Sequence, residues 1–187
     1  MIKEAVTASR TVRTFDESSP VSREMLLSLI DTARLSPSAM NAQPLRYKPV
    51  TDKDTVETLV SMTKYGGALP DLKLPPDGHH PTAFIAVCAD TEVTGRFAMF
   101  DAGLACQSLM LKASEEGIGG VILASFVPEK VAELLSLGER YVPLVLIALG
   151  KPDEQVRLTN ADGSTKYYRD ENNVHVVPKR RLEDIIL

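Results

Sequence analysis

The chain has 187 residues, a hydrophobic fraction of 44% and a formal net charge of −4. This length and composition suit a single globular domain with a substantial apolar core. The negative balance argues against a general affinity for nucleic acid or for anionic membrane surfaces. We therefore expect neither nucleic acid nor membrane among the partners.

Cysteine usage and the first residues of the sequence favour a reducing compartment. Cys88 and Cys106 stand in apolar surroundings without the spacing of metal ligands, which is typical of buried free thiols. The first six residues carry an acid and no long apolar run, so we expect no signal peptide. No stretch approaches the ~20 apolar residues of a membrane helix. These features predict a cytoplasmic protein.

Helical patterns and a polar connection occupy the first third of the chain. Residues 2–9 and 22–34 have helical apolar spacing, with Ser22 as a plausible N-cap of the second helix. Residues 36–45 hold two prolines and several uncharged polar side chains. Such side chains suit the edges of a planar heterocycle, and a plain polar loop is an equal alternative. A strand over 47–50 and a helix over 53–63 follow.

The remaining two thirds predict a sheet packed between helices. Residues 64–81 hold four prolines and three glycines, and an irregular connection of this length is usually functional or mobile. A long helix over 94–116 is apolar around much of its circumference, which predicts burial on nearly all sides. A short helix starts at Pro128, and residues 155–169 predict a surface hairpin. Buried strands are expected over 82–89, 121–126 and 142–150.

The sequence lacks the motifs of enzymes that react through their own side chains. It has no glycine-rich nucleotide motif after a strand, no P-loop and no nucleophile elbow. His79 and His80 lie in the Pro/Gly-rich segment without a carboxylate at ligand spacing, so a solvated loop is favoured over a metal site. We assign no catalytic side chain and no metal ligand. If the chain is an enzyme, a bound cofactor carries the reaction.

Two basic clusters stand far apart in the sequence, each next to apolar residues. Arg10 and Arg13 flank Thr11, and Lys179 to Arg181 form the second cluster. If the fold brings them together, they would hold a phosphate monoester through charge-assisted hydrogen bonds. For any one of these residues, a solvated surface charge is the more common role.

Four segments in a familiar order resemble the FMN-dependent nitroreductase family. They are Arg10–Phe15, Pro37–Pro44, Asp101–Leu109 leading to Gly117–Gly119, and Pro178–Leu182. The resemblance runs from about residue 2 to the last residues. It implies one domain over 1–187 with an α+β fold, in which a central mixed β-sheet is wrapped by helices. It also implies an intertwined homodimer with FMN sites at the interface.

The resemblance further implies which residues would hold FMN. Arg10, Thr11 and Arg13 would bind the ribityl phosphate from one side, and Lys179 and Arg181 from the other. The isoalloxazine ring would meet the polar loop of the partner chain and a strand of its own chain. The residues implied for the ring are Pro37, Ser38, Ala39, Met40, Asn41 and Gln43 in the loop, and Leu123 and Ala124 in the strand.

The implied activity is hydride transfer from NAD(P)H, or another reductant, through bound FMN to a small acceptor such as a nitroaromatic or a quinone. Two alternatives stay open. One is an FMN-binding protein that stores or senses flavin without turnover. The other is an enzyme of the same fold that modifies the flavin or dehalogenates an aromatic. Segment 64–81 stands where relatives carry a lid, and the hairpin over 155–169 has no assigned role.

Overall fold

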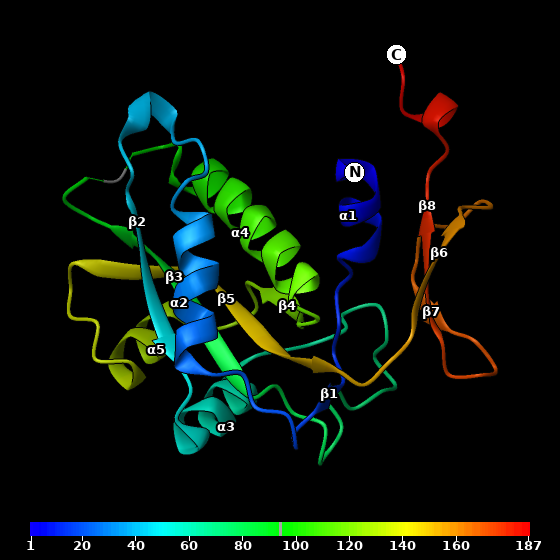
Figure 1. Cartoon of the computed structure of the whole chain (residues 1–187), viewed down its shortest axis with the longest axis horizontal. Helices are drawn as coiled ribbons and strands as arrows, with labels where there is room; N and C mark the ends of the chain where they lie inside the picture. Colours follow the sequence, from blue (N-terminus) through cyan, green and yellow to red (C-terminus); the bar gives the residue numbers. More distant parts are fainter. Residues whose placement is uncertain (94) are drawn as a thin grey trace.

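The computed structural model describes residues 1–93 and 95–187. Helices and strands are distributed along the whole chain (Figure 1). The α-helices are α1 (Ile2–Ala8), α2 (Arg23–Ala33), α3 (Lys53–Met62), α4 (Ala98–Glu115) and α5 (Pro128–Leu134), with short 3₁₀ turns η1 (Ala39–Asn41) and η2 (Leu182–Asp184). The strands are β1 (Phe15–Asp16), β2 (Leu45–Val50), β3 (Ala83–Asp90), β4 (Gly119–Leu123), β5 (Tyr141–Pro152), β6 (Val156–Asn160), β7 (Tyr168–Arg169) and β8 (His175–Lys179).

The central sheet has five strands and confirms the α+β class. Its order is β1-β5-β3-β2, and β4 also pairs with β5. Every pair of these named strands is antiparallel. The sheet was expected to be mixed; among the residues that the structure describes, its parallel contribution is a single bridge between Thr11 and Gly120. That bridge brings the segment between α1 and β1 against the start of β4.

Strand β3 lies in the interior of the protein, with both of its faces covered. Ala83, Ile85 and Val87 pack in one apolar cluster with residues of α2 and α4. The alternate residues, such as Phe84 and Ala86, pack in a second cluster with residues of α3 and α5. Side chains of a strand alternate between faces, so a strand covered on both sides reads as a continuous apolar run. The two free cysteines are buried in this core, as predicted.

Capping residues set the starts of two helices close to the predicted positions. The hydroxyl of Ser22 accepts a 3.1 Å hydrogen bond from the amide of Met25, and this interaction begins α2. The carboxylate of Asp52 accepts a 2.9 Å bond from the amide of Thr55 and begins α3 in the same way. Each cap satisfies a backbone donor that has no partner inside its helix.

The long helix α4 begins at Ala98, four residues after the predicted start; residue 94 lies outside the described residues. Its inner side packs against the sheet through Ala102, Cys106 and Leu109. The expectation of burial on nearly all sides is wrong for a single chain, because Phe100 is 70% exposed and Leu104 is 48% exposed. Helix α1 likewise buries none of its residues.

The turn after α4 is tighter than the sequence suggested. Gly117 has a φ of +71°, which ends the helix. The predicted strand over 121–126 instead runs from Gly119 to Leu123, so both expected bounds of this strand were wrong. Gly119 belongs to the strand because it pairs with Gly150 of β5, and the chain before β1 passes close to it. A Cβ on Gly119 would lie 2.7 Å from the side chain of Val12.

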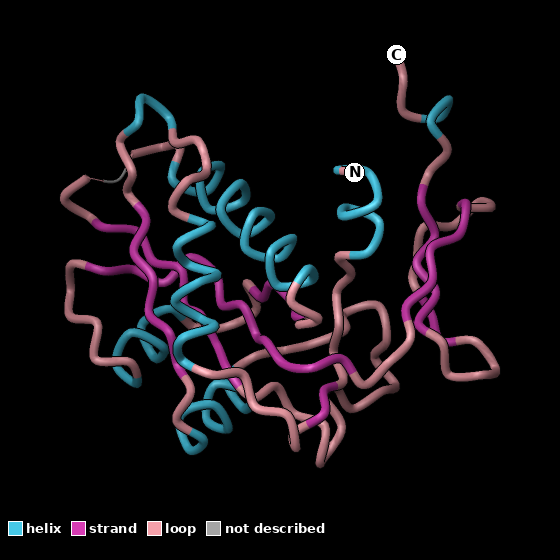
Figure 2. The backbone as a smooth tube through the Cα atoms, in the orientation of Figure 1, coloured by secondary structure: helices cyan, strands magenta, loops and turns pink. Residues whose placement is uncertain are grey.

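The segment after β5 forms a separate three-stranded sheet and is not the predicted hairpin. Strand β8 lies between β6, with which it is parallel, and β7, with which it is antiparallel. The turn near Asn160–Ser164 exists, but the strands on either side of it do not pair with each other. The connection over 64–81 contains no helix or strand, as expected (Figure 2).

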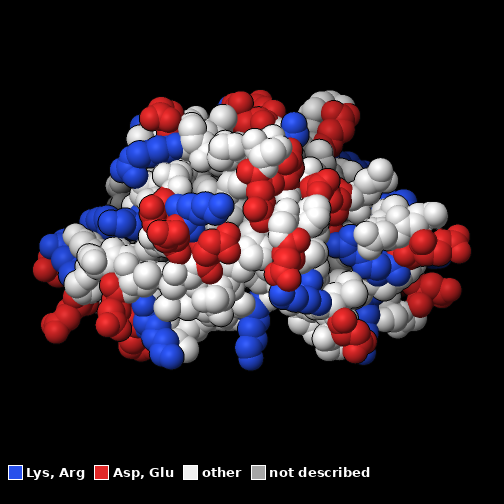
Figure 3. Space-filling view, turned by 90° about the horizontal axis from the view of Figure 1, so that it is seen from below, with Lys and Arg blue, Asp and Glu red and all other residues white. Residues whose placement is uncertain are grey.

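Two features of the structure concern membranes and nucleic acid. None of the described helices combines the length and the apolar character needed to cross a membrane. On the face shown in Figure 3, Lys and Arg side chains are interspersed with Asp and Glu side chains. A one-sided basic surface, which is the usual feature of nucleic-acid binding, does not cover this face.

Candidate functional site

The first predicted basic cluster and Lys179 of the second cluster line one cavity of about 410 Å³. Arg10, Thr11 and Arg13 reach it from the segment between α1 and β1, and Lys179 reaches it from the end of β8. The amide of Val12 donates a 2.9 Å hydrogen bond to Gly120, which fixes that segment along β4. The rest of the lining consists of Ser9, Gln107, Met110, Gly120, Val121, Ile122, Tyr167, His175 and Val177.

Neither arginine of this cavity forms an ion pair with a carboxylate of the described residues. A terminal nitrogen of Arg10 donates to the carbonyl of Val6 at 2.5 Å, and one of Arg13 lies 3.1 Å from His175. The Nε atoms of both arginines are buried without a hydrogen-bond partner. Burial lowers the pKa of both guanidinium groups from the usual value. Buried cations with unused donors make this cavity suited to an anion.

Arg13 is enclosed by groups from the C-terminal sheet. Arg13 as a whole is 9% exposed, and its guanidinium carbon lies 4.8 Å from the ring centroid of Tyr167. His175 is 1% exposed, and its ring centroid lies 5.2 Å from that of Tyr167. Burial, followed by the nearby charges of Arg13 and Arg169, lowers the pKa of His175 to about 4. The imidazole is therefore neutral at neutral pH.

Glu154 holds the backbone at the same place without pairing with the guanidinium of Arg13. Its carboxylate accepts hydrogen bonds from the amides of Arg13 and Thr14, and it pairs with Arg169. The carboxylate side chain is 2% exposed. Glu154 thus holds the backbone of Arg13 and Thr14, and the guanidinium of Arg13 stays available to the cavity.

The strand and the C-terminal turn place some predicted residues outside the cavity. Leu123 is 4% exposed and packs in the core, and Ala124 follows the end of β4. The side chain that β4 directs into the cavity is Ile122, which is 45% exposed. Side chains of a strand alternate between its two faces, so Ile122 faces the cavity and Leu123 faces the core. Arg181 is exposed, 4.0 Å from Glu183, and does not line the cavity.

Sequence reasoning also missed Gln107, Tyr167 and His175 as lining residues. Gln107 stands inside a quoted segment on α4, so its position could have been noticed. Tyr167 stands just before β7, which pairs with β8, the strand that begins with His175, and both residues contact Arg13 far away in the sequence. That pairing has no local signal in the sequence.

The polar loop lies elsewhere in the chain. Ser38 donates a 2.7 Å hydrogen bond to Asp101, and the amide of Gln43 donates a 2.9 Å bond to Ser38. Met40, Asn41 and Gln43 all have positive φ values, between 48° and 54°. Pro37, Ser38 and Gln43 line a small cavity of about 110 Å³, whereas Ala39 and Met40 lie in the η1 turn. Non-glycine residues in this conformation cost energy and gather at functional sites.

The loop and the basic cavity occupy different regions of one chain. In Figure 1, the loop before β2 is at the upper left, whereas α1 and β8 are at the right, beyond α4. No residue of the loop lines the basic cavity. The six predicted loop residues and the four basic-cavity residues are therefore not brought together within a single chain.

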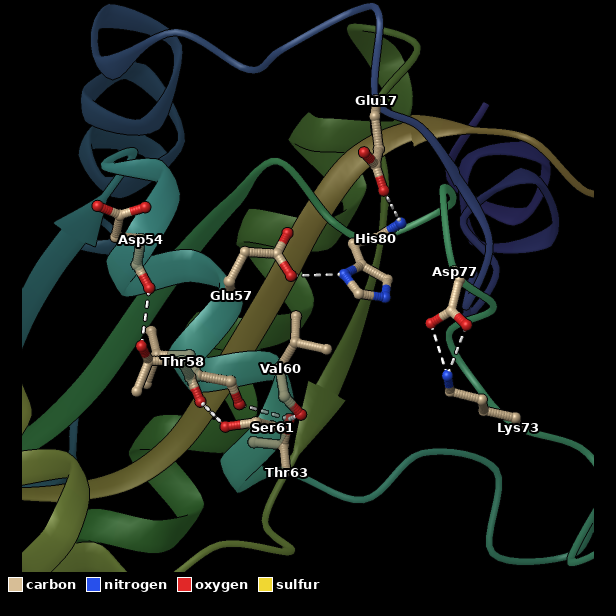
Figure 4. Close-up of polar contacts among 11 residues, drawn as sticks. Glu17, Asp54, Glu57, Thr58, Val60, Ser61, Thr63, Lys73, Asp77 and His80 are labelled. Carbon is tan, nitrogen blue, oxygen red and sulfur yellow. Dashed lines mark hydrogen bonds and ion pairs between the residues drawn. The ribbon is translucent and has the colours of Figure 1, made fainter.

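The adjacent histidines each contact one carboxylate. Nδ1 of His80 lies 2.8 Å from Glu57, and the amide of His80 donates to Glu17 (Figure 4). Nδ1 of His79 lies 2.8 Å from Asp153. These carboxylates are distant in sequence, so spacing alone could not identify them. The described residues contain no group of three potential metal-ligating side chains.

Comparison with known proteins identifies the family from this chain's sequence. The sequence profile of the Nitroreductase family matches residues 6–69 and 72–151, which is most of the chain. The chain belongs to the nitroreductase family. The match includes the Arg10–Arg13 segment, the polar loop and β4, and it ends before the three-stranded sheet that carries Lys179.

Curated relatives within the nitroreductase family are moderately similar. A protein of Methanothermobacter thermautotrophicus, provisionally named NADH dehydrogenase/NAD(P)H nitroreductase, is 27% identical over 158 residues, covering 82% of this chain and 78% of that protein. YodC of Bacillus subtilis, provisionally named an NAD(P)H nitroreductase, is 26% identical over 182 residues, covering 82% of this chain and 90% of its own.

Solved structures agree with the nitroreductase fold over almost the whole chain. A nitroreductase family protein of Streptococcus pneumoniae superposes with a TM-score of 0.72, at 20% identity, covering 100% of this chain and 99% of its own. An NADPH:FMN oxidoreductase of Vibrio harveyi complexed with NAD⁺ superposes with a TM-score of 0.70, at 22% identity. The match covers 99% of this chain and 75% of that protein. At these identities the likeness establishes the fold.

Proposed function

We propose that this nitroreductase-family chain is an FMN-dependent oxidoreductase. It would transfer a hydride from NAD(P)H to a small acceptor such as a nitroaromatic or a quinone. The observation that carries the proposal is the cavity in which Arg10 and Arg13 have unused buried donors and no acid partner among the described residues. The names of the curated relatives, which specify NAD(P)H, guide the choice of electron donor.

The residues of the cavity fit the phosphate of FMN. A phosphate monoester offers three acceptor oxygens and up to two negative charges, which match two guanidinium groups and one ammonium. Arg10, Arg13 and Lys179 would supply those cations, and Thr11 would supply a hydroxyl. Arg181, two residues beyond Lys179, would add positive charge from outside the cavity. The unpaired Nε atoms would then gain partners.

The strand β4 would carry the ring of the flavin. Gly120 and Ile122 line the same cavity as the arginines, so a molecule anchored by its phosphate would extend along this strand. Leu123 and Ala124 would contribute through the backbone beyond Ile122. Bound FMN would supply the reacting ring, which takes a hydride from the nicotinamide and gives it to the acceptor. The chain itself would bind, orient and shield that ring.

A second copy of the chain would complete the site. Pro37, Ser38 and Asn41, with Ala39, Met40 and Gln43, would reach the ring of FMN anchored on the other protomer. This arrangement is supported by the separation of the loop from the basic cavity in one chain. It is also supported by the apolar outer side of α4, where Met99, Phe100 and Leu104 are all about half exposed or more. Large exposed apolar faces usually mark interfaces.

The visible spectrum of the purified full-length chain tests the proposal. We expect a flavin spectrum after reconstitution with FMN, and rapid bleaching when NADH or NADPH is added without oxygen. Addition of a nitroaromatic or a quinone should then restore the oxidised spectrum. A colourless protein that does not bind FMN would refute the proposal. A coloured protein that no reductant bleaches would identify a protein that stores flavin.

A further inference from the structure

Two side chains, His175 of β8 and Tyr167 just before β7, contact the Arg13 guanidinium. Nε2 of His175 lies 3.1 Å from a terminal nitrogen of Arg13, and the ring of Tyr167 lies against its guanidinium carbon at 4.8 Å. Both side chains line the basic cavity. The family profile ends at residue 151, so neither residue lies in the matched region.

The hydrogen bond to Arg13 defines the protonation of His175. A guanidinium has only N–H donors, so Nε2 must accept through its lone pair and the ring proton must be on Nδ1. Nδ1 is buried without a partner among the described residues. The acceptor is neutral, so it orients the cation without cancelling its charge. A carboxylate in this place would have neutralised Arg13 and weakened its attraction for an anion.

Tyr167 fixes the same guanidinium by a different interaction. Its ring lies within the range of a cation–π contact with Arg13. Its hydroxyl accepts a 3.1 Å hydrogen bond from the amide of Ala68, in the segment over 64–81. This bond attaches the Tyr167 side chain to the segment over 64–81.

We infer that His175 and Tyr167 are positioning residues that fix Arg13 and thereby set the preference of the cavity for a phosphorylated flavin over riboflavin. The inference rests on the proposed function. Arginine side chains lose considerable rotamer freedom when they bind a ligand. Two fixed neighbours that remove this freedom before binding strengthen only those contacts that Arg13 makes, which are contacts to the phosphate.

Titration of FMN and of riboflavin into the flavin-free chain tests this inference. The two ligands share the ring and the ribityl chain and differ in the phosphate. In His175→Leu, the acceptor is lost, and we expect FMN affinity to fall about tenfold or more while riboflavin affinity stays within about twofold. In His175→Gln, an amide oxygen replaces the acceptor, and we expect most of the FMN affinity to return.

Tyr167 supplies a second pair of variants at a half-buried position that tolerates change better. In Tyr167→Leu, the aromatic face is lost, and we expect FMN affinity to fall about threefold to tenfold with riboflavin affinity unchanged. Tyr167→Phe keeps the ring and should keep the preference. His79→Leu, which alters a histidine outside the cavity, should bind both flavins as the parent chain does.

The controls separate failure of the inference from failure of the proposed function. If the parent chain does not bind FMN more tightly than riboflavin, the assignment of the cavity to a flavin phosphate is wrong. If the parent chain prefers FMN and Arg13→Ala removes the preference, the proposed site stands. In that case, an unchanged preference in His175→Leu and Tyr167→Leu would overturn the inference. Equal losses for both flavins would also overturn it, because they indicate a merely structural role.

Discussion

The hydroxyl of Ser38 donates a 2.7 Å hydrogen bond to the carboxylate of Asp101, which joins the polar loop to the first turn of α4. The same carboxylate accepts a 3.1 Å bond from the amide of Ala39. Asp101 is 5% exposed. The strained loop is thus anchored to the helix whose outer side we propose as the dimer interface, so its geometry and that interface are coupled.

Replacing Asp101 should destabilise the chain substantially. In Asp101→Ala, a buried hydroxyl and a backbone amide lose their acceptor, which costs about 2–3 kcal/mol in the free energy of unfolding. Urea denaturation measures this change. Asp31→Ala is the matched control, because Asp31 forms an exposed ion pair with Arg34 and its loss should cost less than about 0.5 kcal/mol. Equal losses in the two variants would contradict the anchoring role.

Mixed dimers should reveal whether the loop serves the site of the other protomer. We expect Asn41→Ala and Arg13→Ala homodimers each to lose FMN binding at both sites. A heterodimer of the two variants would have one site with both lesions and one site with none. Its FMN content, measured on differently tagged and purified heterodimers, should be about half that of the parent dimer. An FMN content near zero would show that the loop serves the site of its own chain.

His175 should make the chain less stable at mildly acidic pH. Its pKa of about 4 in the folded chain lies below the value of about 6.5 expected when unfolded, so the unfolded chain binds more protons between these limits. The stabilisation is complete above pH 6.5 and is lost as the pH falls towards 4. It amounts to at most about 3 kcal/mol. Urea denaturation at several pH values measures it.

The variant His175→Gln provides the reference for this pH dependence. Its side chain does not titrate, so the free energy of unfolding should vary less between pH 6.5 and 4 than in the parent chain. Other groups contribute equally to both proteins and cancel in the difference. Parallel curves for the parent and the variant would show that His175 is not responsible.

Local patterns predicted most elements, and the errors occurred where distant contacts decide. The run that became β3 and the cap at Ser22 needed no tertiary information. The start of β4 depends on its pairing with β5, and the exposed side of α4 depends on what covers it; neither is encoded locally. Arg10 and Arg13 were identified by their motif. His175 was not, because it contacts Arg13 from a distant part of the sequence and no local pattern indicates that contact.

The two cysteines should be unreactive in the folded protein. Cys88 is 1% exposed and Cys106 is 2% exposed, and burial raises the pKa of their thiols to about 11 and to about 12. A thiolate is the reactive form, so both groups are protected by access and by protonation. A chromogenic disulfide reagent at pH 8 should detect no free thiol before urea is added and both thiols afterwards.

A surface cysteine provides the positive control for that assay. Ser125 is exposed after β4, so Ser125→Cys should react at once in the folded protein. Immediate reaction of either natural cysteine would show that the core around β3 opens rapidly.

The pairing of β8 with both β6 and β7 has a consequence for the continuity of the chain. Strands β6 and β7 are each held by β8 and do not hold one another. No pairing of β6 with β7 therefore crosses the turn over Asn160–Ser164, in which the amide of Ala161 donates a 2.7 Å hydrogen bond to Lys179 of β8. A protease that cuts there should release no fragment, because β8 retains the strands on both sides. The part of this turn after Ala161 is a suitable place to open the chain or to insert a reporter peptide, because Ala161 itself bonds to Lys179 of the cavity.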